Sequence, residues 1–358
     1  MNVLFVVRST LFTVKGGDTT QVIETAAQLR LLGVETDIKL TGEKIDYSPY
    51  DLLHFFNIIR PADILVHIKK SKKPFVVSSI LVDYSGYDKK QRPGFAGILF
   101  RRMPAAGIEY VKTIYRALLR KDRLSSIAYL WKGQHRSIKE ILQKTKSVLV
   151  NADEEYRQLV KEYKVTPDFM IVPNGVNTDL FRPSPSIQRE EDLVLCVARI
   201  EGIKNQYHLI KALNNTQYRL LLIGDAAPNQ LDYYNKCKKM AAGNISFISQ
   251  LPQHQLLEYY AKAKVHVLPS WFEVCGLASL EAAAMGCNVV ITNNGYARSY
   301  FNDDAFYCDP ADAGSILSAV DKAASNELNT SLQQKIINQY SWKQTGEKTI
   351  STYKKYIQ

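Results

Sequence analysis

Short apolar runs alternate with helical patterns along most of the chain, and no other feature of the sequence constrains the fold as strongly. In the first half, the runs expected to be strands are 3–7, 35–40, 52–56, 75–79 and 148–151, and the expected helices are 19–32, 98–123 and 154–162. Runs that are apolar throughout and joined by helices are typical of parallel strands covered on both faces. The first half therefore predicts an α/β domain.

A Pro-Asn-Gly turn at 173–175 precedes a second series of the same kind. Its expected strands are 193–198, 220–224, 245–248, 265–269 and 288–292, and its expected helices are 205–213, 231–242, 253–262 and 277–285. With 358 residues the chain has room for two cores. We predict two Rossmann-like, doubly wound domains facing a central cleft, at 1–172 and 173–341, with a last helix at about 342–358 that packs back on the first domain.

Composition and cysteine usage favour a cytoplasmic protein. No apolar stretch reaches the roughly 18 residues that a membrane-spanning helix needs. The opening run MNVLFVV is followed directly by Arg8 and is typical of a buried strand rather than of a signal-peptide core. The five cysteines contain no C-x-x-C pair and lie mostly in apolar runs, so we expect them to be reduced and buried.

One segment carries the whole charge imbalance of the chain. The formal net charge is +11, and residues 89–146 alone contain fifteen Lys or Arg against three acidic residues. Such a segment suits nucleic acid, an anionic membrane or a phosphate-bearing substrate. Because no RNA-binding motif accompanies it, we expect no nucleic-acid partner and favour an anionic membrane surface. A solvated helical face and a groove for a phosphorylated acceptor are the alternatives.

Two glutamates eight residues apart mark the strongest candidate site. Glu273 is expected in a loop after a strand, and Glu281 in the second turn of a helix that starts near Gly276. The amides of Cys275, Gly276 and Leu277 at this helix start are expected to face a phosphate, because a helix N-terminus offers unpaired N–H groups and a favourable dipole. A carboxylate can accept hydrogen bonds from vicinal sugar hydroxyls.

Two further loops suit phosphate. Arg199 and Lys204 follow the first strand of the second half, where fixed cations would stabilise a diphosphate leaving group as its bond to the sugar breaks. Gly16 and Gly17 open the first helix of the chain, where a Gly-Gly turn lets backbone amides approach a phosphate or an incoming hydroxyl.

The E-x7-E spacing, with G-L-x-x-L-E-A-x-A-x-G around it, resembles the donor-site motif of the retaining glycosyltransferases of family 4, which have the GT-B fold. The resemblance covers nearly the whole chain and is best at 173–310. It implies that Glu281 holds the nucleotide ribose and that Glu273 contacts hydroxyls of the transferred sugar. It also implies that Arg199 and Lys204 grip the donor diphosphate.

The resemblance extends to other loops and fails in one of them. It implies that the Gly-Gly loop borders the donor phosphates and the acceptor, and that the backbone at Gln250 and Leu251 meets the nucleotide base. The family often has a His in the loop after the strand that 75–79 matches, close to the sugar. This chain has no His there, and Asp83 is the nearest polar candidate for a sugar or acceptor contact.

Together these features predict a retaining transferase that moves a hexose-type sugar from a UDP- or GDP-sugar to a hydroxyl of a glycan, lipid-linked or lipopolysaccharide-type acceptor. The first domain would bind the acceptor and the second the nucleotide sugar. No cofactor or metal is expected, since the chain has no D-x-D motif. A non-catalytic nucleotide-sugar-binding subunit on the same scaffold is the alternative. The expected location is the cytoplasm or the cytoplasmic face of the inner membrane.

Overall fold

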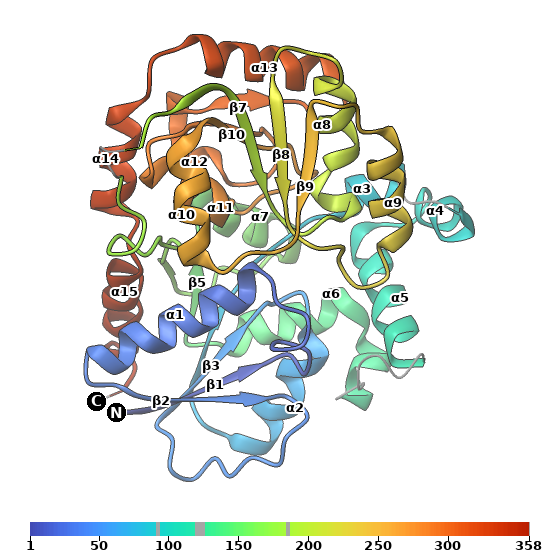
Figure 1. The fold of residues 1–358 in the computed structure, drawn as a ribbon. Helices are drawn as coiled ribbons and strands as arrows, with labels where there is room; N and C mark the ends of the chain where they lie inside the picture. The colour runs from blue at the N-terminus through green and yellow to red at the C-terminus, as the bar shows by residue number, and fades with distance from the viewer. Residues whose placement is uncertain (91–93, 119–125, 184–186, 358) are drawn as a thin grey trace. The chain divides into compact units, whose positions relative to one another are not determined.

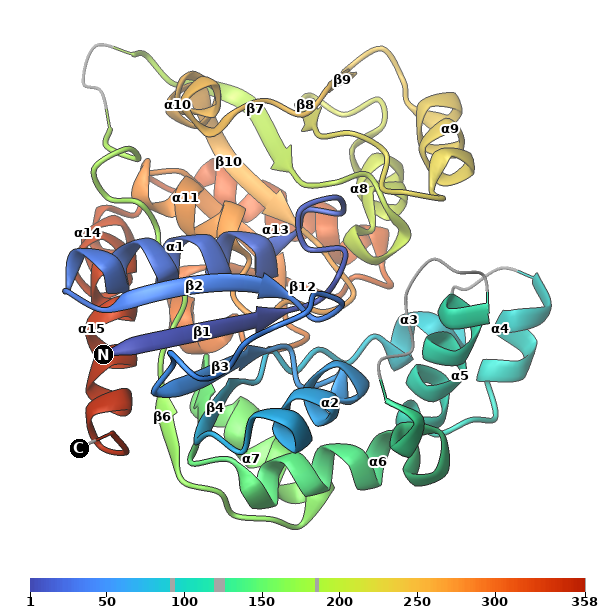
Figure 2. The same cartoon turned by 90° about the horizontal axis from the view of Figure 1, so that it is seen from below.

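The computed structural model describes residues 1–90, 94–118, 126–183 and 187–357, which form two compact units. Unit 1 comprises Met1–Asn174 and Trp342–Gln358, and unit 2 comprises Gly175–Ser341. Figure 1 and Figure 2 show that each unit contains one sheet with helices packed beside it. Each sheet has six strands, and every pairing between them is parallel in the described chain. The predicted α/β fold with two doubly wound sheets is confirmed.

The sheet of unit 1 has the strand order β2-β1-β3-β4-β5-β6. Its strands are β1 (Asn2–Val7), β2 (Glu35–Leu40), β3 (Leu52–Phe56), β4 (Phe75–Ser78), β5 (Ser147–Val150) and β6 (Phe169–Ile171). The helices of the unit are α1 (Gly17–Leu31), α2 (Pro61–Ser71), α3 (Ser85–Lys90), α4 (Gly94–Phe100), α5 (Ala105–Leu118), α6 (Ile127–Lys144), α7 (Asp153–Tyr163) and α15 (Trp342–Lys354).

The sheet of unit 2 has the strand order β12-β11-β10-β7-β8-β9. Its strands are β7 (Glu190–Val197), β8 (Arg219–Ile223), β9 (Ile245–Ile248), β10 (Ala263–Leu268), β11 (Asn288–Thr292) and β12 (Phe306–Cys308). The α-helices of the unit are α8 (Gln206–Leu213), α9 (Leu231–Met240), α10 (Gln253–Lys262), α11 (Leu277–Ala284), α12 (Arg298–Phe301), α13 (Ala313–Ser325) and α14 (Thr330–Gln339), and short 3₁₀ turns form at Gly202–Lys204 and Asn302–Asp304.

The expected continuous helix at 98–123 is wrong. The helix α4 ends at Phe100 and α5 begins only at Ala105, and residues 119–123 lie outside the described residues. Pro104 explains the break, because proline lacks an amide donor and disfavours helical backbone in the residue before it. The helix α6 was not predicted at all. Its backbone is non-helical at Gly133, and this kink interrupts the spacing by which a helix is recognised.

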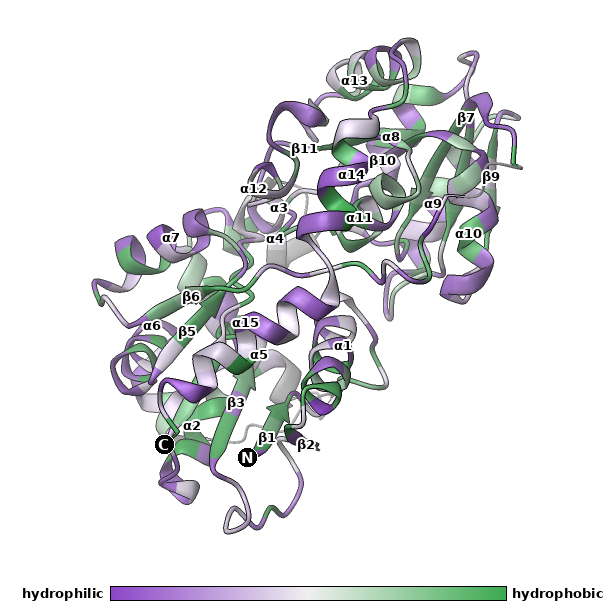
Figure 3. Cartoon of the chain, turned by 90° about the vertical axis from the view of Figure 1, so that its left-hand side faces the viewer, coloured by the Kyte–Doolittle hydropathy of each residue, from purple (hydrophilic) through white to green (hydrophobic). Residues whose placement is uncertain are grey.

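Apolar clusters form the core on both faces of each sheet. Figure 3 shows the strands coloured largely hydrophobic, whereas the ribbons of the surrounding helices alternate between hydrophobic and hydrophilic residues. All five cysteines are buried within these cores and form no disulfide bond, so their expected use as small hydrophobic side chains is confirmed.

The last helix, α15, completes the core of unit 1. Tyr353 is fully buried, and its hydroxyl lies 2.6 Å from Nδ1 of His54 on β3. A Cβ atom at Gly346 would lie 2.6 Å from the Cβ atom of Gln28 on α1. The absence of a side chain at this position therefore allows α15 to pack closely against α1.

Three buried histidines make the stability of both units sensitive to mild acid. Burial lowers the pKa of His54 and of His266 to about 3 and that of His67 to about 4. In the unfolded chain a histidine has a pKa of about 6.5 and therefore takes up a proton that the folded chain excludes. The folded chain therefore has its full stability above pH about 6.5. As the pH falls below this value, each histidine lowers the free energy of unfolding by about 1.4 kcal/mol per pH unit.

We predict that the free energy of unfolding, measured with urea, falls between pH 7 and pH 5, before most carboxylates titrate. His67→Gln keeps hydrogen-bonding capacity toward Thr41 and Tyr47, the partners of the His67 ring. In this variant, unfolding of unit 1 should take up about one proton fewer, so its free energy of unfolding should depend less on pH. Equal stability of the wild-type protein at the two pH values would contradict the prediction.

Candidate active site

The strand order of unit 2 brings two chemically distinct loops to the same edge of its sheet. The neighbouring strands β7 and β10 are parallel, with Val194 beside Val265, so their carboxyl ends meet at one edge. The loop after β7 carries Arg199 and Lys204, and the loop after β10 carries Glu273. Ligands of doubly wound sheets bind outside the carboxyl ends of the strands at the point where the strand order reverses, which here lies between β7 and β10.

An ion pair joins these two loops. Lys204 Nζ lies 2.5 Å from Glu273 Oε1, and the side chains are 21% and 8% exposed. On the same loop as Lys204, Arg199 Nη2 lies 2.8 Å from Glu201 Oε1. The structure therefore brings Lys204 and Glu273 into direct contact, and each predicted cation lies beside a carboxylate. Partial burial strengthens such pairs because the local dielectric is lower than that of water.

Hydrogen bonds from Asn205 and Trp271 fix the spacing of the two loops. The Trp271 N–H donates to the Ile203 carbonyl at 2.9 Å. The buried Asn205 adopts a positive φ of 63°, and its side-chain amide donates to the Pro269 carbonyl at 3.0 Å. Neither residue was predicted to belong to the site. The only signal in the sequence is an asparagine directly after Lys204, since asparagine tolerates the left-handed region better than most residues.

The segment after β11 holds the backbone of Glu273. The Glu273 N–H donates to the Asn294 carbonyl at 3.1 Å, and the Glu273 carbonyl accepts from the Tyr296 N–H at 2.8 Å. Gly295 lies between these two contacts with φ of 108°, and a Cβ atom there would lie 2.0 Å from the Glu273 carbonyl oxygen. Only glycine fits this position, because the backbone is left-handed and the approach is too close for a side chain. Gly295 also was not predicted.

Two side chains of α10 orient Glu281. Glu281 lies in the second turn of α11, where Oε1 accepts from Gln253 Nε2 at 2.9 Å and Oε2 accepts from the Tyr260 hydroxyl at 3.0 Å. Burial, together with the Glu281 carboxylate, raises the pKa of Tyr260 well above its usual value, so the phenol remains a donor. Each carboxylate oxygen can accept more than one hydrogen bond, so the arrangement allows Glu281 to accept from further hydroxyls.

The start of α11 offers backbone donors at the same edge of the sheet. Gly276 is the N-cap residue and Leu277 the first residue of the helix. No backbone hydrogen bond from the amides of these two residues is found within the described chain. Cys275, the third predicted amide position, is buried in the core beside β10 and β11. The helix start thus provides N–H groups of the kind that bind phosphate.

Gln250 and Leu251 lie in the loop after β9. The Gln250 N–H donates to Asp225 Oδ1 at 3.3 Å, so this amide already has a partner on the loop after β8. Leu251 packs against the apolar cluster that contains α11 residues. The contact between Gln253 and Glu281 places this loop near the second glutamate.

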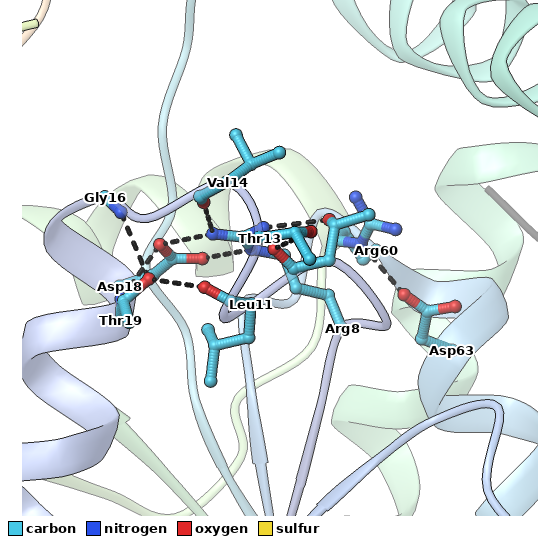
Figure 4. Close-up of polar contacts among 10 residues, drawn as sticks. Arg8, Leu11, Thr13, Val14, Gly16, Asp18, Thr19, Arg60 and Asp63 are labelled. Carbon is cyan, nitrogen blue, oxygen red and sulfur yellow. Dashed lines mark hydrogen bonds and ion pairs between the residues drawn. The ribbon is translucent and has the colours of Figure 1, made fainter. Parts of the chain in front are cut away.

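Gly16, Gly17 and Asp83 belong to unit 1, whereas the other predicted site residues belong to unit 2. Arg8 holds the Gly-Gly loop, because its guanidinium contacts both carboxylate oxygens of Asp18, at 2.6 Å and 2.9 Å (Figure 4). The Gly16 N–H donates to Thr19 Oγ1 at 3.1 Å and is therefore engaged within the loop. Gly17 is the first residue of α1.

Asp83 lies in the loop between β4 and α3. Its Oδ1 accepts from the Ser85 N–H at 2.8 Å, which forms an Asx turn directly before α3. The residue lines a small cavity of about 50 Å³ together with Glu109, Glu162 and Tyr163. Burial raises the pKa of Glu162, and the negative charge of Asp83 contributes to the rise. This cavity can accept hydroxyl or amine hydrogen-bond donors.

A buried glutamate on α7 fixes the loop that leads to Asp83. Glu155 accepts from Ser79 Oγ at 2.6 Å, from the Leu81 N–H at 2.7 Å and from the Asn151 N–H at 2.6 Å. Between the first two, Ile80 adopts a positive φ of 43°, which is rare for a β-branched residue. Burial raises the pKa of Glu155, and the hydrogen bonds that it accepts oppose the rise. No sequence pattern distinguishes this glutamate from its neighbours on α7.

The described part of the chain contains no group of three or more His, Cys, Asp or Glu side chains arranged to hold a metal ion. None of the helices described is both long enough and apolar enough to cross a bilayer. The charged side chains at the edge of unit 2 can bind a polyanion through Arg199 and Lys204 and hydroxyl groups through Glu273 and Glu281.

A doubly wound sheet with cations and carboxylates at the reversal point of its strands is typical of a nucleotide-binding Rossmann-like domain. Residues 177–341 match the model of a family described as glycosyl transferases group 1. The sequence of unit 2 therefore matches that family, in agreement with the resemblance described above.

Among curated relatives, the D-inositol 3-phosphate glycosyltransferase of Geodermatophilus obscurus is 26% identical over 242 residues, which cover 60% of this chain and 53% of the relative. The chain thus spans about half the length of the first curated relatives that it matches.

Among solved structures, sucrose-phosphate synthase from Thermosynechococcus elongatus has a TM-score of 0.75 and 16% identity, with coverage of 99% of this chain and 98% of that one. The Anabaena protein HepE, in complex with UDP and glucose, has a TM-score of 0.71 and 14% identity, with 99% of both chains covered. Both likenesses confirm the predicted GT-B fold.

Gly295→Ala is expected to destabilise unit 2 by about 1–3 kcal/mol, because the new methyl group would clash with the Glu273 carbonyl and the backbone is left-handed. The matched control is Gly243→Ala in the same unit, where a Cβ atom would meet nothing within 4 Å. The control should change stability by no more than about 0.5 kcal/mol. Thermal unfolding measures both variants, and equal midpoints would refute the role of Gly295.

Glu155→Ala is expected to lower the stability of unit 1 by at least about 3 kcal/mol, because it leaves three buried donors without an acceptor. Glu154→Ala, on the exposed side of the same helical turn, is the control and should cost less than about 1 kcal/mol. Urea unfolding followed by circular dichroism measures the difference. If the two variants unfold alike, Glu155 does not anchor the loop.

Proposed function

We propose that this protein is a glycosyltransferase that takes a UDP- or GDP-linked hexose as donor and transfers the sugar, with retention at the anomeric carbon, to a hydroxyl of a glycan, lipid-linked or lipopolysaccharide-type acceptor. The observation that carries the proposal is the contact between Lys204 and Glu273 at the point where the strand order of unit 2 reverses. The crystal structure of HepE with UDP and glucose, a protein of the same fold, supports a nucleotide sugar as the ligand class.

The ion pair suits a site that exchanges partners when the donor binds. Lys204 Nζ and Glu273 Oε1 lie 2.5 Å apart, and the two charges neutralise each other. A diphosphate carries more negative charge than one carboxylate and would compete for Lys204, with Arg199 as the second cation. Glu273 would then be released to accept hydrogen bonds from hydroxyls of the transferred sugar.

The remaining contacts divide between the nucleotide and the phosphates. Glu281, oriented by Gln253 and Tyr260, would accept hydrogen bonds from the ribose hydroxyls. The amides of Gly276 and Leu277 would donate to the diphosphate. Gln250 would meet the base through its backbone carbonyl, since its amide is engaged by Asp225.

In the proposed reaction, the bond between the anomeric carbon and the phosphate oxygen breaks while the acceptor oxygen bonds to the same carbon from the same face. The proton of the acceptor hydroxyl passes to the leaving phosphate, so no protein base is required. Arg199 and Lys204 stabilise the charge that develops on the diphosphate, and we propose that the reaction needs no metal.

In this proposal unit 1 binds the acceptor. The Gly-Gly loop at Gly16 and Gly17 and the Asp83 cavity provide its polar groups. The cavity beside Asp83 and Glu162 measures about 50 Å³, so it suits a single hydroxyl group of an acceptor, from which a carboxylate can accept a hydrogen bond.

Lys204→Ala and Glu281→Gln are each expected to lower kcat/KM for a nucleotide sugar by about a hundredfold or more while circular dichroism shows that the fold is retained. Lys239→Ala, an exposed lysine on α9, is the control and should retain full activity. Transfer is measured by release of nucleoside diphosphate against a panel of UDP- and GDP-sugars, with and without EDTA.

Full activity of Lys204→Ala would refute the electrostatic part of the proposal, and loss of turnover in EDTA would refute its metal independence. Calorimetry on the same panel separates the rival function. Tight nucleotide-sugar binding without hydrolysis or transfer would identify a binding subunit instead of an enzyme.

A further inference from the structure

The segment rich in basic residues folds into a distinct group of helices in unit 1. We call the described residues of α3, α4, α5 and the first turns of α6, up to Arg136, the basic lobe. Figure 1 and Figure 2 both place α3, α4 and α5 together beyond the carboxyl ends of the strands of unit 1. Contacts between α3 and α4 and between α5 and α6 hold the lobe together.

Large apolar side chains lie on the outside of this lobe as well as on its inside. Phe100, Ile108 and Tyr129 face inward and are buried. Five others are exposed, namely Ile98 (63%), Leu99 (44%), Tyr115 (60%), Leu130 (40%) and Trp131 (86%). A merely solvated helical face would carry polar residues at such positions. Several large exposed apolar residues on α4, α5 and the start of α6 favour an interaction surface on this lobe.

Among the described residues, the acids in and beside the lobe pair with its lysines, whereas several arginines form no ion pair. Lys112 contacts both Asp88 and Glu109, and Lys132 pairs with Glu140. Arg101 and Arg102, which directly follow the apolar α4, are exposed and form no ion pair within the described chain. Exposed Ile98 and Leu99 are thus followed by two arginines that form no ion pair with a described residue.

The exposed end of α6 repeats this combination. Leu130 and Trp131 precede Lys132, and Arg136 follows one turn later without an ion pair to a described residue. A tryptophan that is almost fully exposed suits a membrane interface, where its ring meets the acyl region and its N–H remains near water.

We propose that the basic lobe docks on an anionic lipid bilayer, with Ile98, Leu99 and Trp131 inserted among the lipids and Arg101, Arg102 and Arg136 at the headgroups. Isolated aliphatic side chains gain free energy in the acyl boundary but gain none from a phosphate backbone, which disfavours nucleic acid as the partner. An anionic surface also explains why residues 89–146 contain fifteen Lys or Arg against three acidic residues, an excess that a protein partner does not require.

The inference deepens the proposed function, because it assigns the acceptor to a membrane surface. Its test does not require turnover. If the chain binds anionic vesicles but transfers no sugar, the proposed function is refuted and this inference is supported. If the chain transfers sugar but does not bind anionic vesicles, this inference is refuted and the proposed function is supported.

Trp131 itself is the probe. The chain has three tryptophans, and Trp271 and Trp342 are buried at 8% and 5% exposure. Vesicles of phosphatidylcholine with phosphatidylglycerol should shift the tryptophan emission of the full chain to shorter wavelengths and protect it from acrylamide quenching. Vesicles of phosphatidylcholine alone should have little effect. Trp131→Phe should abolish the shift.

Charge reversal tests the electrostatic contribution. Arg101→Glu with Arg102→Glu should weaken sedimentation with the anionic vesicles by about thirtyfold or more, since each basic side chain near an anionic surface is worth about a factor of five. The matched control reverses Lys69 and Lys70, an adjacent exposed pair at the end of α2, and should bind as the wild type does. Wild-type binding should also weaken as salt is added.

A second pair of variants tests insertion. Ile98→Ser with Leu99→Ser should weaken binding about tenfold or more, whereas Leu31→Ser, at an 80% exposed position on α1, should have no effect. Sedimentation without a change in Trp131 emission would show that another face binds and would overturn the proposal. Equal binding to neutral and anionic vesicles would overturn it as well, as would salt-sensitive binding to single-stranded RNA without binding to vesicles.

Discussion

The pairing of β7 with β10 is the constraint on which the unit 2 site depends. Strands far apart in the sequence become neighbours, and because they are parallel their carboxyl ends meet at one edge. The cation Lys204 and the carboxylate Glu273 then lie 2.5 Å apart, although 69 residues separate them. The adjacent start of α11 adds backbone donors to the same edge.

The side chains of the candidate site are held in place by the groups that pack behind them. Asn205 and Trp271 join the loops after β7 and β10, and Gly295 supports the Glu273 backbone. Glu155 performs a related task in unit 1, where it satisfies three donors around the strained Ile80. Buried polar groups of this kind are costly unless fully satisfied, so they fix a single loop conformation.

Much of the fold could be predicted because the spacing of apolar residues and the residue types of turns depend only on positions close together in the sequence. The alternation of strands and helices gave two parallel α/β units, and the E-x7-E pattern located Glu273 and Glu281. The helix predicted at 98–123 failed at Pro104, and α6 escaped prediction because of its kink at Gly133. Both failures occur where a local break, rather than a continuous period, decides the backbone.

By itself, then, the sequence determined the α/β class, the repeated sheet and the residue types of the candidate site, since these follow from neighbours a few positions apart. The tertiary structure alone decided that Lys204 pairs with Glu273, that Glu281 is held by Gln253 and Tyr260, and that the Gly16 amide is engaged by Thr19. It also decided which cations of the basic lobe remain unpaired. These contacts depend on strand order and on the packing of elements distant in sequence, for which no short-range pattern exists.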